Sequence, residues 1–171
     1  QDSRGKIYTY ETPFGESITD DFVDTELPPT EETPVDYSIY FETFGSEVTG
    51  LTTEGENHFK GHVVIPRTIG DREVASIGAR AFNMKDILSV RLPEGLLNIK
   101  EGAFDSNNLS SINIPDSVIT IGDGAFFGNQ LTGIILGENL RIIGEGAFRG
   151  NSLKNIILPQ SITNIENGAF L

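Results

Sequence analysis

The chain contains no cysteine and no tryptophan, one methionine and only two histidines in 171 residues. Because there is no cysteine, disulfide bonds and thiolate metal sites are excluded. Basic residues are also scarce, with 12 Lys and Arg against 25 Asp and Glu, a formal net charge of −13. Proteins that bind nucleic acid or anionic membrane surfaces cluster Lys and Arg, so this balance argues against both functions.

Long apolar runs are missing as well, and no stretch approaches the roughly 20 residues that a membrane-spanning helix needs. We therefore expect no membrane insertion. The chain begins at Gln1 rather than at Met. A secretory signal peptide removed before Gln1 fits this start, and so does trimming of a longer chain.

Motifs of catalysis are absent too. Residues 121–131 read "IGDGAFFGNQL", with the spacing GxGxxxG and no GK[ST] after it, so this run is not a phosphate-binding loop. No GxSxG is present, and any hydrolytic triad would have to use His58 or His62. A carboxylate pair for glycoside hydrolysis remains open, because such pairs form only in space. We expect no enzymatic activity and no cofactor.

The chain does contain a repeat of 22 residues. Phenylalanine recurs at this step, an alanine precedes each copy, and an isoleucine lies five residues before it: Phe82, Phe104, Phe126, Phe148 and Phe170; Ala81, Ala103, Ala125, Ala147 and Ala169; Ile77, Ile99, Ile121, Ile143 and Ile165. A fixed period of about 20–50 residues indicates a solenoid, in which each coil packs on the next.

One repeat, residues 109–131, shows the expected local structure. Residues 111–114 alternate polar and apolar side chains, which predicts a short strand that Pro115 ends. Residues 117–122 predict a second short strand, and Gly122 and Gly124 predict a tight turn. The predicted class is therefore mainly β with short turns and 3-10 segments, with each core residue stacked on its copy about 4.8 Å away.

Three regions are predicted along the chain. Residues 1–36 hold ten acids and two bases among Thr and Pro, which favours an extended segment, with a possible short strand at 6–11. Residues 37–66 predict a capping hairpin around Gly45 and further strands. Residues 67–171 hold the repeats, with a five-residue insertion near 68–73 that we expect to be a loop and with Gly137 in place of the strand-ending proline.

The sequences "LSSINIPDSVITIGDGAF" and "LKNIILPQSITNIENGAF" resemble the BspA-like, or Treponema-type, leucine-rich repeat. The resemblance covers about residues 62–171. It implies a leucine-rich repeat solenoid of about five 22-residue coils with an N-terminal β-hairpin cap. It also implies secretion or display on a bacterial cell surface, and adhesion to host proteins or to proteins of neighbouring cells.

The outward residues of the first strand of each repeat are the candidate binding site, because the concave strand surface of a solenoid is its usual binding face. They are Ser89, Arg91, Ser111, Asn113, Ile135, Asn155 and Ile157, with Gly133 beside Ile135. The surface becomes apolar toward the C-terminus. The two isoleucines either mark a contact patch, or only favour strand, or pack against another repeat or a second molecule.

Acidic side chains recur at two repeat positions: Glu94, Asp116 and Glu138; Glu101, Asp123 and Glu145. Stacked carboxylates suit Ca²⁺, so the second set is a candidate metal site, the alternative being that all of them extend into water. Asn107, Asn129 and Asn151 keep the same step, which predicts a structural ladder with Lys85 as the exception. We interpret His58 and His62 as solvated loop residues rather than as zinc ligands with Glu54 and Glu56.

These observations predict a non-enzymatic, secreted or cell-surface module that binds an extracellular or host protein through the strand surface. One alternative is a structural spacer or self-assembling unit that associates through its C-terminal end. A further alternative is a carbohydrate-binding module.

Overall fold

The computed structural model describes residues 36–171, so the predictions for residues 1–35 lie outside the described residues. The described part begins with the 3-10 helix η1 (Tyr37–Ile39), and hydrogen bonds from Ser38 lower the pKa of Asp36 at its start. The predicted hairpin follows as β1 (Phe41–Phe44) and β2 (Glu47–Leu51), which pair antiparallel. The helix α1 (Thr53–Phe59) and strand β3 (His62–Val64) then lead into the repeats.

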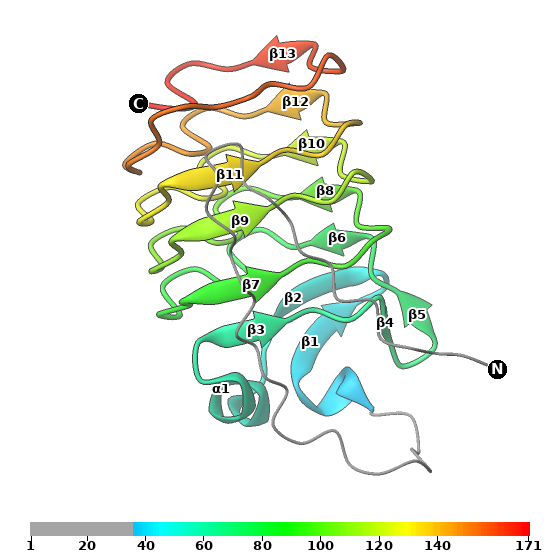
Figure 1. The fold of residues 1–171 in the computed structure, drawn as a ribbon. Helices are drawn as coiled ribbons and strands as arrows, with labels where there is room; N and C mark the ends of the chain where they lie inside the picture. Colours follow the sequence, from blue (N-terminus) through cyan, green and yellow to red (C-terminus); the bar gives the residue numbers. More distant parts are fainter. Residues whose placement is uncertain (1–35) are drawn as a thin grey trace, which may run out of the picture. The chain divides into compact units, whose positions relative to one another are not determined.

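The rest of the chain is a series of short strands joined by turns (Figure 1). They are β4 (Thr68–Ile69), β5 (Arg72–Glu73), β6 (Ser76–Ile77), β7 (Ser89–Arg91), β8 (Asn98–Ile99), β9 (Ser111–Asn113), β10 (Thr120–Ile121), β11 (Gly133–Ile135), β12 (Ile142–Ile143) and β13 (Asn164–Ile165). The protein is thus mainly strand with little helix, as the sequence predicts for leucine-rich repeats.

One row of strands forms a seven-stranded sheet in the order β1-β2-β6-β8-β10-β12-β13. From β2 onward the pairs are parallel, and each strand meets the next repeat in register, as Ile99 does with Ile121. The hairpin therefore continues the sheet, with Val48 of β2 paired to Ile77 of β6.

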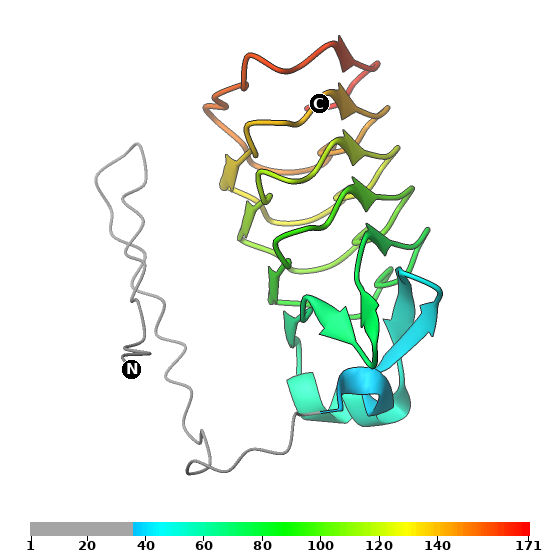
Figure 2. The same cartoon turned by 90° about the vertical axis from the view of Figure 1, so that its right-hand side faces the viewer.

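A second row holds β3, β7, β9 and β11, whose arrows point the same way (Figure 1), and the two rows lie on different sides of the stack (Figure 2). Here only β3–β7 and β9–β11 form ladders. The last repeat departs from the prediction, because residues 155–157 form no strand. The equivalent backbone groups of the fourth and fifth repeats do not come into ladder geometry.

The predicted core columns are confirmed. The phenylalanine rings stack through the repeats with centroids 5.0–5.4 Å apart and nearly parallel planes. The alanine before each ring is buried, as is the preceding isoleucine in all but the last repeat. A small alanine beside each large phenylalanine lets successive turns approach closely, since protein interiors pack at crystal-like density.

A ladder of asparagine side chains lies beside the rings, as predicted. The amide nitrogen of Asn129 donates to the carbonyl oxygens of Phe104 and Phe126, and its Oδ1 accepts from the N–H of Leu109. Asn107 and Asn151 make the same set of contacts one repeat earlier and one later. Each asparagine thus joins two repeats through backbone groups that would otherwise be buried without partners.

Two local predictions were wrong. Residues 53–59 form a helix rather than a loop, and the Thr52 hydroxyl caps it by accepting from the Gly55 N–H at 3.1 Å. Gly55 lowers the helix propensity of this segment. Only glycine fits there, because a Cβ would lie 2.1 Å from the backbone carbonyl oxygen of Tyr40. His58 is in this helix and stacks on Tyr40 at 4.3 Å. The inserted residues form the antiparallel pair β4–β5 rather than an irregular loop.

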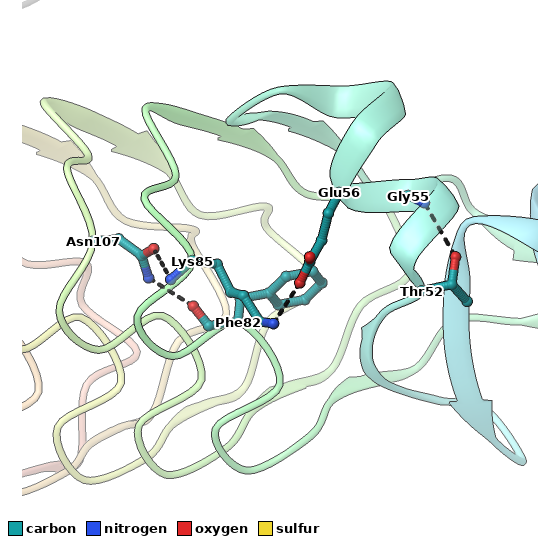
Figure 3. Close-up of polar contacts among 6 residues, drawn as sticks. All are labelled: Thr52, Gly55, Glu56, Phe82, Lys85 and Asn107. Atoms are coloured by element: carbon teal, nitrogen blue, oxygen red, sulfur yellow. Dashed lines mark hydrogen bonds and ion pairs between the residues drawn. The ribbon is translucent and has the colours of Figure 1, made fainter.

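The junction between α1 and the first repeat explains why Lys85 breaks the asparagine ladder (Figure 3). Its backbone N–H still donates to Asn107 of the next repeat at 3.1 Å. Its side chain instead points toward α1 and forms an ion pair with Glu56. A cation fits here because the neighbouring element is a helix that presents a carboxylate, not a turn that presents carbonyl oxygens.

The last described repeat leaves its core positions partly open. Leu158 is 45% exposed and Ile165 is 39% exposed, whereas the equivalent Leu136 and Ile143 are 8% and 0% exposed. In the earlier repeats, the repeat that follows completes the burial of these two positions.

Substitution of Asn129 by alanine should destabilise the protein by about 1–3 kcal/mol, because it leaves the buried N–H of Leu109 without a partner and removes the hydrogen bonds to the Phe104 and Phe126 carbonyls. Thermal or denaturant unfolding of the full chain measures this. Asn151→Ala should cost less, since Asn151 is only partly buried, and Asn57→Ala on exposed helix surface should have little effect. Equal losses for Asn129 and Asn57 would contradict the structural role of the ladder.

Gly144→Ala should destabilise the protein by about 1–3 kcal/mol through overpacking. A Cβ at Gly144 would lie 2.6 Å from the backbone nitrogen of Asp123 in the preceding repeat. Gly133→Ala is the matched control, because a Cβ there meets nothing within 4 Å. We expect its melting temperature to be no lower than that of the parent chain, and the reverse ranking would refute close repeat contact at Gly144.

Candidate functional site

We use the name strand face for the outward side chains of β7, β9 and β11 together with Asn155 and Ile157, which hold the equivalent positions of the fifth repeat. It comprises the predicted residues Ser89, Arg91, Ser111, Asn113, Ile135, Asn155 and Ile157. In β9 the middle residue Ile112 is buried while Ser111 and Asn113 are exposed, since successive side chains of a strand alternate in direction. Parallel pairing sets Asn113 beside Ile135 and Ser111 beside Gly133.

The strand face also includes a residue that sequence reasoning missed. Pairing of β3 with β7 sets His62 beside Ser89, and the Nδ1 of His62 lies 3.0 Å from the Ser89 hydroxyl. His62 precedes Ser89 by 27 residues, because the inserted β4–β5 segment lengthens the first repeat beyond 22. Subtracting the five inserted residues restores the register, so the signal was present in the sequence.

The strand face is apolar at one end. Ile135 is 42% exposed and Ile157 is 71% exposed, although Ile157 lies outside any strand in the structure. Isolated exposed isoleucines are ordinary, but these two hold the same position in successive repeats, with polar Asn113 paired to Ile135 and Asn155 two residues before Ile157. The interpretation that Ile157 merely favours strand does not hold, because the structure forms no strand there.

Acids border the strand face but do not lie on it. Glu94, Asp116 and Glu138 each follow β7, β9 or β11 by three residues, and all three are exposed. Because these strands run in the same direction, their ends lie at one edge, which we call the acidic margin (Figure 1). In the first repeat Arg67 holds this position and pairs with Glu73 at 3.2 Å.

The opposite edge of the strand face is formed mostly by amides. Gln130 donates to Asn108 at 2.9 Å, and Asn108 donates to Asp86 at 3.5 Å. This amide margin is therefore bonded along the stack, from repeat to repeat. The two edges of the strand face differ in charge, so the surface is not equivalent from one edge to the other.

The candidate Ca²⁺ column has other partners. Glu101 accepts from Arg80 at 3.1 Å, and Asp123 Oδ1 accepts from the backbone N–H of Glu145 at 2.9 Å. Asp116 accepts from the N–H of Glu138 in the same way. Across residues 36–171, no group of three or more His, Asp or Glu side chains is placed to hold a metal ion. The aspartates thus have a structural role, bonding one turn to the next.

Two hollows lie on the described part of the chain, and the first reaches Val63 of β3 and Asp86 of the amide margin. One, of about 290 Å³, lies between α1 and the first repeat over Leu51, Phe59 and Ile87, with Lys85 and Glu56 among its lining residues. The other, of about 230 Å³, lies beside the exposed ring of Phe127. Neither lining contains serine or histidine, so neither hollow holds a Ser–His pair.

Comparisons agree with the predicted family. A search of curated proteins found no match. Within the described residues, no helix is long and apolar enough to cross a membrane. The family model of the BspA-type leucine-rich repeat region matches residues 52–171 in six copies, starting ahead of the position 62 expected from the sequence. This region includes α1, the strands from β3 to β13 and the whole strand face. The chain belongs to the BspA-type leucine-rich repeat family.

Proposed function

We propose that this chain is a secreted or cell-surface adhesion module that binds an extracellular protein through its strand face. Its architecture would be a solenoid of about five coils, closed at the N-terminal end by the β1–β2 hairpin. The family supports a surface or protein-binding repeat module, and such repeats are generally not enzymes. The identity of the partner as a host or neighbouring-cell protein is the finer part of the proposal.

One observation supports the proposal: the outward residues of β9 and β11 differ, whereas their inward residue is the same. Gly133 and Ile135 replace Ser111 and Asn113 at the outward positions, whereas Ile134 keeps the inward position of Ile112. An exposed hydrophobic area rimmed by polar residues is typical of a protein-binding surface. The exposed side chains at the seven-stranded sheet supply a comparison surface, with Ile119, directly before β10, 38% exposed.

The double variant Ile135→Asp, Ile157→Asp should lose binding to a partner found on a panel of purified extracellular matrix and serum proteins. Two carboxylates in a desolvated contact should weaken binding by at least about 30-fold. Surface-based binding assays with the full chain measure this, and melting temperatures establish that the variant is folded.

Ile119→Asp is the matched control, because Ile119 is about as exposed as Ile135 but lies directly before β10 of the other sheet. It should bind as the parent does. A partner that Ile119→Asp loses and the double variant retains would move the site to the seven-stranded sheet. If nothing on the panel binds and the parent but not the double variant doubles in mass by light scattering, self-association replaces adhesion as the function.

A further inference from the structure

The charge on and around the strand face is unevenly distributed. The chain carries 25 acids, yet the outward residues of β3, β7, β9 and β11 include none of them. Arg91 and His62 are the ionisable side chains among them, both toward the N-terminal repeats. Over the third and fourth repeats the face is neutral, with Asn113 and Ile135 at its centre.

The acidic margin beside this neutral area has no counter-ion. Residues 36–171 contain four ion pairs, which join Arg67 to Glu73, Arg80 to Glu101, Lys85 to Glu56 and Lys100 to Glu47. None of them involves Glu94, Asp116 or Glu138. Asp116 uses one oxygen to accept from the Glu138 N–H, while the carboxylates of Glu94 and Glu138 have no hydrogen-bond partner in this part of the chain.

The amide margin gives no such attraction, since its side chains already bond to one another along the stack. A partner that lies across the strand face therefore meets three carboxylates without counter-ions at one edge. At the other edge it meets bonded amides and Asp86, whose carboxylate accepts from Asn108. Unpaired exposed carboxylates favour basic groups, and their field adds to that of a chain with net charge −13. Complementary charge sets orientation and association rate more than total affinity.

We propose that the partner of the strand face is a protein segment that combines one apolar side chain with Lys or Arg to one side of it. The apolar side chain packs on Ile135 and Ile157, and the basic side chains meet Glu138, Asp116 and Glu94. This inference rests on the proposed function, because it assigns the chemistry of a partner to the same surface.

The test is selection of a displayed library of random peptides on the immobilised full chain. Peptides that also bind the double variant Ile135→Ser, Ile157→Ser are removed, so that only binders of the strand face remain. We expect the retained sequences to be enriched in Lys and Arg together with aliphatic or aromatic residues. The unselected library gives the reference composition.

Two other outcomes separate the two proposals. Retained peptides with apolar residues but no basic enrichment would overturn the partner chemistry and leave binding by the strand face intact. If no peptide remains once those that bind the double variant are removed, the strand face is not a binding site, and both proposals fail.

A charge-matched pair of variants tests the acidic margin directly. Glu94→Gln with Glu138→Gln should weaken a retained basic peptide about threefold to tenfold at low salt, mainly by slower association. Glu42→Gln with Glu145→Gln removes the same charge from other exposed positions and should have a smaller effect. The difference should vanish near 0.5 M salt, where screening shortens to about 4 Å. Equal effects of the two pairs would show attraction by net charge alone and overturn the assigned role of the margin.

Discussion

Each repeat of this protein buries its core residues against the same residues of the next repeat, and every other feature depends on that register. The phenylalanine rings stack only because the step is constant, and the asparagine amides bond carbonyls of two repeats only at that spacing. Gly144 shows how tight the constraint is, since any Cβ would meet the backbone of the preceding turn. Stability in such a chain is close to a sum of repeat and interface terms, so local changes act on neighbours first.

The same register leaves a defined set of outward positions free to vary in residue type. In β9 and β11 the inward isoleucines are kept while the outward residues change from Ser and Asn to Gly and Ile. Outward side chains contribute little to the core, so they can change chemistry without changing the fold. The strand face is therefore where this architecture can encode a partner. The turns are less free, because Asp116 and Asp123 bond the next repeat there.

Most of the repeat fold could be predicted, because a 22-residue period repeats each signal several times. Features that occur only once in the chain have no repeated signal of this kind. The helix α1 is one short element with Gly55 inside it, and tertiary contact with Tyr40 decides its structure. His62 was missed on the strand face because the β4–β5 insertion shifts its register. The acidic margin was visible in the sequence as a recurring repeat position. Only the structure shows that its carboxylates lack counter-ions among the described residues.

The two ends of the phenylalanine stack show what the N-terminal elements contribute. Phe82, at one end, is fully buried, whereas Phe170 at the other is only partly buried. The Lys85–Glu56 ion pair is not what closes the N-terminal end of the stack, since exposed ion pairs contribute only about 0–1 kcal/mol to stability. The apolar residues Val48 and Leu51 belong to the same core cluster as Phe82, and they bury the apolar surface that dominates folding. The hairpin therefore extends the core cluster of the repeats beyond Phe82 toward the N-terminus.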